Sequence, residues 1–508
     1  RRQRQMCIRD SLYQKALHDN PALAHSNPIS RFWQKQRIKK QYAKALKTGG
    51  KVKKTAEATA KAAKKTAQET KRATFFVVRH WKGCLIVGGI AFIVLLFFGG
   101  LSSCSLFGGN SGSGSSGGKK ALTFQIWDVA QKEGMEAMCA AYTQQHPEVS
   151  IEVQVTSWNE YWTKLEAAAT SNQMPDIFWM HTNELLKYAD NGMLADCSDI
   201  VEKDKFSEIS LSNAMGSNGT LYAVPKDKDT VGLVYNKEMF DAAGVAYPDE
   251  NWTWDDLVSA SEKIYAATGK YGYMAYADDQ LGYWNFVYQA GGYILNEDKT
   301  KAGFTQPATE KAMKFYIGLQ QNDWCPDQTY FAETAPGTAF FSEKGAMFLE
   351  GDWNILAELQ NYPEMVGKWD VAVLPKCPDP ESGDGRATIS NGLCYATAAS
   401  NKNLDTVKDI LKFFGSEEGQ RIQGESGAAI PAYQGLEDTW AGCFAEYPIN
   451  IQCFIEMFEY SIQSVNNASR PEWKSKVNDE LLKIYAGTED IETGLQKMQD
   501  IVDQASAG

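Results

Sequence analysis

The order of the apolar segments after residue 120 constrains the fold of this chain more than any other feature. Residues 122–128 read as a strand, residues 149–155 alternate as a second strand, and residues 177–180 form a third strand after Pro175 and Asp176. Helical spacing of apolar residues separates these strands, at Met135, Met138, Cys139 and Tyr142 and then at Tyr161 and Leu165. Strands that alternate with helices predict a doubly wound α/β lobe.

Residues 221–240, LYAVPKDKDTVGLVYNKEMF, join two kinds of local structure. A mixed segment ends at Pro225, four charged residues follow at 226–229, and the apolar run 230–235 reads as a buried strand. A charged segment between two strands suits a hinge. We therefore expect the chain to pass from one lobe to a second lobe here.

The rest of the chain predicts a second, largely helical lobe. Further strands are expected at 346–349 and 370–374, and late helices at 407–414, 477–484 and 491–502. We expect three crossings between the lobes, near 225–229, 346–353 and 390–393. The first lobe would then contain residues 121–225 and 347–391, and the second lobe residues 230–345 and 394–508.

Charge divides the chain into two unlike parts. Residues 1–82 hold 22 of the 51 Lys and Arg and 4 of the 63 Asp and Glu, which leaves 29 and 59 in the remainder. Residues 83–101 are uncharged, mostly apolar and long enough to cross a bilayer as a helix. The positive-inside rule predicts that residues 1–82 are cytoplasmic. We therefore expect a chain in the cell membrane, with its acidic part on the extracytoplasmic side.

The basic segment 1–82 is expected to be a helical, solvated region near the anionic membrane surface. We expect no nucleic-acid partner, because no aromatic residues interleave with the charges of its Ala/Lys tract. Residues 83–101 are a transmembrane helix or the h-region of a signal. Leu101-Ser102-Ser103-Cys104 has the small-residue form of a lipoprotein cleavage box, so Cys104 is a candidate for lipidation. A plain membrane helix is the alternative.

Residues 102–120 are rich in Gly and Ser and predict a flexible linker. The GxSxG at 114–118 carries no nucleophile, because it lies in low-complexity sequence without a flanking strand and helix. Ten cysteines are scattered without CxxC or zinc spacing, so we expect small core residues and leave disulfide pairing open. No metal or cofactor is expected.

Polar and aromatic residues follow the predicted strands at the positions where α/β sheets bind ligands. The candidate ligand-binding residues are Trp127, Asp128, Trp158, His181, Asp229, Trp284, Trp353 and Asn391. Aromatic rings pack on the C–H faces of a sugar, and carboxylates and amides pair with its hydroxyl groups. Each Trp has core packing as its alternative, and the short polar residues have turn or cap roles.

Catalytic motifs are weak in this sequence. Only His146 and His181 lie beyond the apolar segment, neither in an HExxH motif, and no pair of acidic residues is singled out for glycoside hydrolysis. The acidic loop Asp379, Glu381 and Asp384 lacks EF-hand spacing.

An ordered set of motifs between residues 122 and 502 resembles the sugar-binding family 1 of bacterial extracellular solute-binding proteins. The motifs are Trp127-Asp128, PDIFWM, the crossing at 221–240, FFSEKGAMFLEGDW, WDVAVLP, SNGLCYATAAS, FFGSEEGQ and GAAIPA. The resemblance implies a two-lobe α/β fold of the type II periplasmic-binding-protein (Venus flytrap) kind. It also implies a non-enzymatic protein that binds a carbohydrate and passes it to an ABC permease by lobe closure.

Residues 13–107 resemble a different kind of protein, the membrane-anchoring start of conjugative mobile-element proteins that carry cell-wall hydrolase domains. The alternative function is therefore a membrane-anchored cell-wall or glycan hydrolase, although the sequence after the linker matches no such domain. Residues 1–11 resemble translated sequencing-adapter sequence, and no interpretation is based on them. A chimera of two genes is a further interpretation of this combination.

Overall fold

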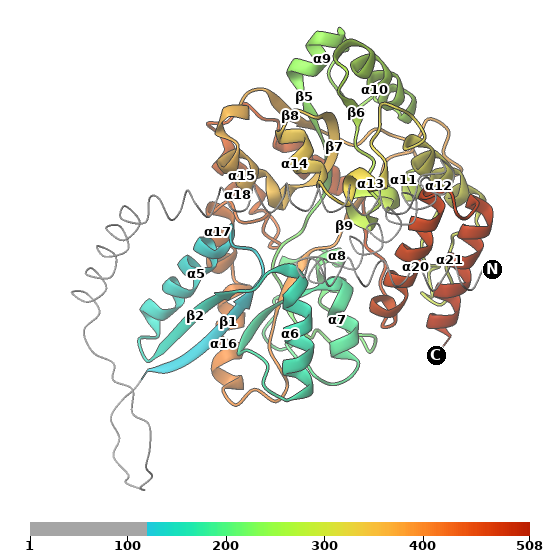
Figure 1. Ribbon diagram of the computed structural model, residues 1–508. Helices are drawn as coiled ribbons and strands as arrows, with labels where there is room; N and C mark the ends of the chain where they lie inside the picture. Colours follow the sequence, from blue (N-terminus) through green and yellow to red (C-terminus); the bar gives the residue numbers. More distant parts are fainter. Residues whose placement is uncertain (1–118, 508) are drawn as a thin grey trace, which may run out of the picture. The chain divides into compact units, whose positions relative to one another are not determined.

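The computed structural model describes residues 119–507 of the chain. Residues 117–508 form one compact unit. Four predictions lie outside the described residues: the basic segment 1–82, the apolar segment 83–101, Cys104 and the linker up to residue 118. Figure 1 draws residues 1–118 and 508 as a thin grey trace. Between residues 119 and 507, no helix has both the length and the apolar character needed to cross a membrane.

A five-stranded sheet in the order β2-β1-β3-β10-β4 forms the first lobe. Its strands are β1 (Lys120–Ile126), β2 (Val149–Val155), β3 (Ile177–His181), β4 (Val224–Pro225) and β10 (Leu393–Ala396). β1 runs parallel to both β2 and β3, whereas β10 pairs antiparallel with β3 and with β4. All five residues of β3 are buried, as expected for a central strand covered on both faces. The three predicted parallel strands are confirmed.

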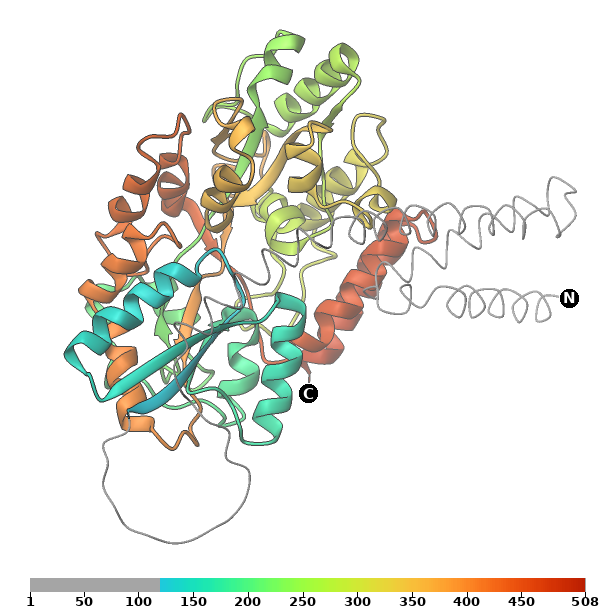
Figure 2. The same ribbon diagram turned by 60° about the vertical axis from the view of Figure 1, so that its left-hand side comes forward.

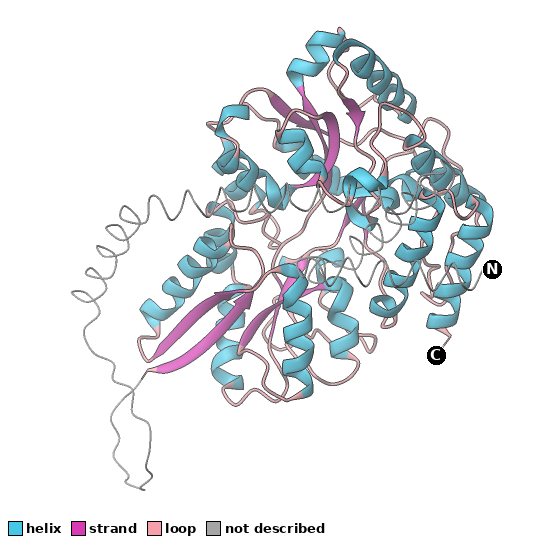
Figure 3. Cartoon of the chain, viewed as in Figure 1, coloured by secondary structure: helices cyan, strands magenta, loops and turns pink. Residues whose placement is uncertain are grey.

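Helices flank this sheet, as Figures 1 and 3 show. They are α5 (Lys132–Gln145), α6 (Trp158–Thr170), α7 (Thr182–Ala189), η2 (Lys203–Lys205), α8 (Glu208–Asn213), α16 (Leu404–Phe414) and α17 (Glu417–Glu425). Tyr395 of β10 packs between helices, because its hydroxyl group contacts Met135 of α5 and its ring lies 5.1 Å from that of Phe414 of α16. Apolar residues at helical spacing thus fix the core of the first lobe.

A four-stranded sheet in the order β6-β7-β5-β8 forms the second lobe. Its strands are β5 (Val231–Asn236), β6 (Tyr271–Tyr273), β7 (Gly345–Gly351) and β8 (Trp369–Ala372). β5 pairs antiparallel with β7 and β8, and β6 runs parallel to β7. Every residue of β5 is buried, which confirms the strand predicted after the charged crossing.

The second lobe is largely helical, as predicted. Its helices before the second crossing are α9 (Lys237–Ala243), α10 (Trp254–Thr268), η3 (Asp279–Tyr283), α11 (Trp284–Gln289), α12 (Pro307–Leu319), α13 (Gln328–Phe331), α14 (Pro336–Phe341), α15 (Asp352–Asn361) and η4 (Pro363–Met365). Those near the C-terminus are α18 (Glu437–Ala441), η5 (Gly442–Phe444), α19 (Gln452–Glu456), η6 (Met457–Tyr460), α20 (Arg470–Tyr485) and α21 (Ile491–Ser506). α10 begins at a capping box of Thr253 and Asp256 and ends at Gly269, whose φ is 68°.

The C-terminal helix α20 contacts both lobes. α20 packs along α21 in the second lobe and also contacts α7 of the first lobe. Figure 2 shows these two helices in red, turned from the view of Figure 1. α20 is therefore one of the elements that both lobes share.

The strand pairing corrects the predicted division into lobes. The crossings at 226–230, between β4 and β5, and at 391–392, just before β10, lie where they were expected. Residues 346–353 are not a crossing, because β7 and β8 both pair with β5. The assignment of 347–391 to the first lobe and of β10, α16 and α17 to the second lobe was therefore wrong. A third crossing lies between α17 and α18, where Ala432 packs in the first core and Trp440 in the second.

The strand β9 (Thr388–Ser390) lies beside the second crossing and pairs in parallel with β11 (Ser461–Gln463). The Thr388 hydroxyl group accepts a hydrogen bond from Val231 N at 2.8 Å, so β9 is held against the start of β5. This two-stranded sheet connects the crossing segments to the C-terminal part of the second lobe.

Candidate functional site

Six aromatic side chains gather at one edge of the first sheet. We call Trp127, Trp158, Tyr161, Trp162, Trp179 and His181 the tryptophan cluster. Trp127 follows β1, Trp158 begins α6 after β2, and His181 ends β3. Because these strands are parallel, their carboxyl ends meet at the same edge of the sheet. The structure thus brings together three of the residues predicted from strand ends.

The tryptophan cluster has a buried base and an exposed tip. Trp179 is buried, Trp127 and Trp162 are partly buried, and the Trp158 side chain is 45% exposed. The Trp127 ring lies 5.1 Å from that of Trp158, which in turn lies 5.6 Å from the His181 ring. Most ring pairs meet edge to face, as aromatic quadrupoles favour. The cluster therefore offers a rigid aromatic surface to a ligand.

His181 is a neutral member of this cluster. Its side chain is 9% exposed, and Nδ1 accepts a hydrogen bond from Asn183 N at 3.1 Å at the start of α7. Burial, helped by the positive charges of Arg470 and Lys474, lowers the pKa of His181 to about 3. The imidazole is therefore uncharged at physiological pH and acts as a capping group and a ring surface.

Asp128 holds the turn after β1. Its Oδ1 accepts from Ala130 N at 2.9 Å and its Oδ2 from Gln131 Nε2 at 3.2 Å. Gln131 Oε1 in turn accepts from Lys226 Nζ at 2.9 Å. The turn role that was the alternative for Asp128 is therefore present, and a ligand contact by this residue stays a prediction.

Hydrogen bonds among Asp229, Gln280 and Asn391 link two of the crossings, and we call these three residues the crossing network. Asp229 Oδ1 accepts from Asn391 N at 2.6 Å, and Asp229 Oδ2 accepts from Gln280 Nε2 at 3.1 Å. Asn391 Nδ2 donates to Gln280 Oε1, which closes the network. Asn391 Oδ1 is buried and receives no hydrogen bond from any described residue. Two predicted residues, Asp229 and Asn391, are thus brought together in one network.

Asp352 and Trp353 lie at the carboxyl end of β7, a strand of the second sheet. Both residues begin α15, directly after β7. The Trp353 ring is partly buried and lies so close to Gly351 that a Cβ there would come within 2.1 Å of it. Asp352 Oδ1 accepts from Thr230 N at 3.0 Å, which ties α15 to the first crossing. Asp352 therefore lies beside the first crossing, and Trp353 is the next residue in α15.

Trp284 lies in the core of the second lobe instead. Its side chain is 1% exposed, and the Arg470 guanidinium lies 4.5 Å from its ring centroid. Arg470 donates to Asp279 Oδ2 at 2.7 Å, and Lys474 Nζ lies 2.8 Å from the same oxygen. Burial alone would raise the pKa of Asp279, but Lys474 and Arg470 together lower it well below the usual range. Trp284 thus supports an ion pair rather than an exposed surface.

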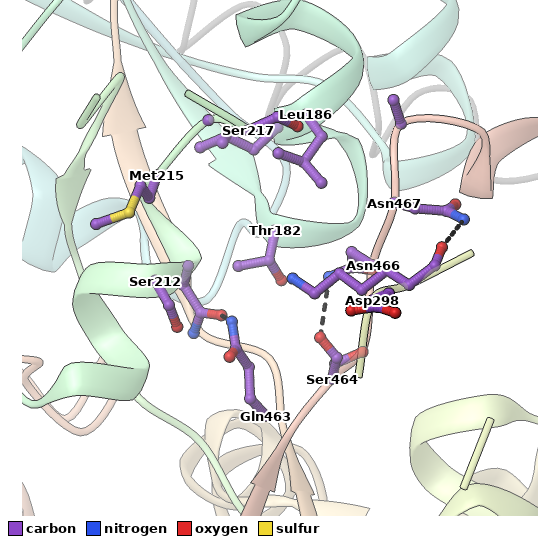
Figure 4. A pocket seen from close by; sticks show the side chains of 15 residues that line it. Thr182, Leu186, Ser212, Met215, Ser217, Asp298, Gln463, Ser464, Asn466 and Asn467 are labelled. Carbon is purple, nitrogen blue, oxygen red and sulfur yellow. Dashed lines mark hydrogen bonds between the residues drawn. The ribbon is translucent and has the colours of Figure 1, made fainter. Parts of the chain in front are cut away.

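A polar cavity of about 410 Å³ lies where α7 and α8 approach the segment after β11 (Figure 4). Thr182, Asn213 and Ser464 are among the residues that line it. Gln463 Nε2 donates to Asn213 Oδ1 at 3.1 Å and so bridges the two lobes. The cavity marks a second place where side chains of both lobes meet.

Within residues 119–507, no three side chains of His, Cys, Asp or Glu lie close enough together to bind a metal ion. The seven cysteines in this range are free thiols, and six of them are buried, as expected for core residues.

The family model of bacterial extracellular solute-binding proteins matches residues 127–421, more than half of the chain. The chain belongs to this family. The matched range begins at Trp127 and contains the tryptophan cluster, the crossing network and every strand of the two lobe sheets except β1. Members of the family are binding proteins.

Known solute-binding proteins are similar to this one over most of their length. The diacetylchitobiose binding protein DasA of Streptomyces coelicolor is 24% identical, over 64% of this chain and 76% of its own. An arabinooligosaccharide-binding protein of Bacillus subtilis is 26% identical, over 65% and 77%. The solved structure of the ABC substrate-binding protein Lmo0181 from Listeria monocytogenes, in complex with cycloalternan, superposes with a TM-score of 0.69. It covers 77% of this chain and 99% of that chain at 22% identity, which shows the two-lobe fold.

The sequence did not point to several residues of this site. Trp162 lies one helical turn after Trp158, so an i, i+4 pattern could have identified it. Gln280 and Arg470 had no comparable pattern, because their partners are distant in sequence. These residues enter the site of the solute-binding protein only through the tertiary fold.

Proposed function

We propose that this solute-binding protein binds a carbohydrate, a mono- or oligosaccharide, where its two lobes meet. Membership of the family supports binding without turnover. The relatives named for diacetylchitobiose and for arabinooligosaccharides support a sugar as the solute. Delivery of the sugar to an ABC permease, with lobe closure as the signal, completes the proposal.

The tryptophan cluster is the observation that carries this proposal. An exposed Trp158 supported by Trp127 presents a flat apolar face to the C–H surface of a sugar ring. Trp353 provides an aromatic residue on the other lobe, next in the chain to Asp352, which accepts a hydrogen bond from Thr230 of the first crossing. Asp229 and Asn391, joined by a hydrogen bond, supply the carboxylate and the amide that would pair with sugar hydroxyl groups.

The segments before the binding domain bear on which side of the membrane this domain lies. We propose that the binding domain lies on the extracytoplasmic side of the cell membrane. The tether would be the apolar segment 83–101 as a transmembrane helix, or a lipid on Cys104. Mass spectrometry of the membrane-extracted protein distinguishes the two, because lipidation would leave Cys104 as a modified N-terminus.

Thermal unfolding with a panel of sugars tests the proposed function. A ligand that binds only the folded state at a hundredfold excess over its Kd stabilises that state by about 2.7 kcal/mol. We expect at least one mono- or oligosaccharide to raise the Tm and to be recovered intact after incubation. Hydrolysis of that sugar by the pure protein would contradict the proposal and favour a glycan hydrolase.

A further inference from the structure

A second cavity, of about 400 Å³, lies wholly within the second lobe, between α14, α15 and the end of β7. Glu350 of β7 and Glu358 of α15 line it, together with Asn354. Because all of its walls belong to one lobe, its shape does not depend on how the two lobes are arranged. The tryptophan cluster contributes nothing to it.

Glu350, which is buried, and Glu358, which is partly buried, form a pair of carboxyl groups. The Glu350 side chain is 7% exposed, and its Oε1 accepts from Gly351 N and Asn354 Nδ2, each at 2.9 Å. Glu358 Oε2 is buried and receives no hydrogen bond from a donor of the described residues. Burial raises the pKa of both side chains. The charge of Glu350 and a hydrogen bond to it raise the pKa of Glu358 further, whereas the same hydrogen bond lowers the pKa of Glu350, so the proton between them is held on Glu358.

The cavity lacks a protein cation to balance these two acids. Its lining contains no Lys, Arg or His, and neither glutamate forms an ion pair with a described residue. A buried carboxylate without an ion-pair partner carries a large desolvation cost. A cation that enters the cavity would reduce this cost, so the acid pair favours a bound cation. A bare divalent metal would need more oxygen ligands than two carboxyl groups and one amide supply.

Aromatic rings form the remaining walls. Tyr276, Phe341, Phe348 and Tyr362 line the cavity, and the rings of Phe341 and Tyr362 stack with centroids 4.3 Å apart at 6°. The faces of aromatic rings attract ammonium groups, more strongly where water is excluded. Aromatic walls around a carboxylate pair are therefore suited to an organic cation rather than to a neutral sugar.

We propose that this cavity binds an alkylammonium group, which replaces the proton shared by Glu350 and Glu358 and packs against the rings of Tyr276 and Phe341. The released proton passes to solvent. The ammonium group belongs either to a small free amine or to an amino sugar. This site is independent of the proposed binding of a carbohydrate between the lobes, and either can fail without the other.

Titration calorimetry of the purified protein at pH 7 tests the proposal, with propylammonium and glucosamine as probes and 1-propanol and glucose as uncharged counterparts. We expect propylammonium to bind and 1-propanol not to bind. Glucosamine that binds and displaces propylammonium would identify an amino sugar as the source, whereas propylammonium alone would identify a free amine. Binding of neither ammonium probe to the wild-type protein would overturn the proposal.

Variants of the cavity complete the test. Glu358→Gln should weaken propylammonium binding at least tenfold, whereas Glu364→Gln, at an exposed glutamate of the same lobe, should leave it unchanged. Ala357→Leu fills the cavity without changing charge and should also abolish binding. Thermal unfolding of each variant reports folding. Unchanged affinity in a folded Glu358→Gln or Ala357→Leu variant would place the ammonium elsewhere and overturn the proposal.

Discussion

Asp229 is a buried carboxyl group whose two oxygens hold the first and second crossings and η3 together. Burial, and then the nearby charge of Asp227, raise the pKa of Asp229 from 3.8 to about 7. A raised pKa means that the folded state binds this proton more tightly than the unfolded state. The stability that Asp229 contributes is therefore complete below pH 3.8 and is lost as the pH rises through 7.

Asp229→Asn should reduce the pH dependence of stability, because asparagine occupies the same volume and does not ionise. Urea unfolding at pH 5 and pH 8 should show the wild-type protein losing more free energy of unfolding between these values than the variant loses. The comparison between variant and wild type cancels the other titrating groups. An equal loss in both proteins would show that Asp229 does not titrate in this range.

The candidate residues that gather in the tryptophan cluster are those that follow a predicted strand. Trp127, Trp158 and His181 were identified in this way, and parallel strands do bring them together. Trp284 belongs to an aromatic-rich segment in which the sequence predicts no strand. It lies in the core, with the Arg470 guanidinium against its ring. Gln280 was missed because its partners, Asp229 and Asn391, are 51 and 111 residues away.

At the scale of the elements, Lys226 holds the first crossing against the first lobe. This side chain is fully buried, with Nζ 2.6 Å from Asp227 Oδ2 and 4.6 Å from the centroid of the Trp179 ring. Asp227 Oδ1 also accepts from Leu393 N at 2.6 Å and so ties the first crossing to the second. The Lys226–Asp227 ion pair thus links the Trp179 ring and the two crossings.

Lys226→Met should lower the free energy of unfolding by about 3–5 kcal/mol, because it leaves the Asp227 carboxylate buried without its partner. The matched control is Lys187→Met, whose exposed pair with Glu166 is worth no more than about 1 kcal/mol. Denaturant unfolding measures both. A loss below 1 kcal/mol in Lys226→Met would mean that the crossing does not depend on this ion pair.

The elements themselves were predictable, but their pairing was not. The buried run of β5, the alternation of β2 and the capping box of α10 all come from local pattern. The lobe to which β7, β8 and β10 belong depends on partners more than a hundred residues away, such as β5 for β7. Register and partner choice arise from the whole core, so a local pattern can place a strand but cannot assign it to a sheet.

At the scale of the whole molecule, the crossings connect two lobes with separate cores, and we propose that they act as a hinge. A sugar that contacts both lobes would favour the arrangement in which both sets of contacts form, by the difference in affinity between arrangements. Small-angle scattering of a fragment of residues 117–508 should show a smaller radius of gyration with saturating sugar than without it. An unchanged radius, with binding confirmed separately, would indicate lobes fixed in one arrangement.

The most direct test of the central claim, that a carbohydrate binds between the lobes against aromatic residues of both, is titration calorimetry of single variants with the sugar that stabilises the protein. Trp158→Ala in the first lobe and Trp353→Ala in the second should each weaken binding about tenfold, as expected for a lost aromatic contact with a ligand. Tyr265→Ala, at a partly exposed aromatic residue on α10, should leave affinity unchanged. Wild-type affinity in a folded Trp158→Ala or Trp353→Ala variant would contradict a site shared by the two lobes.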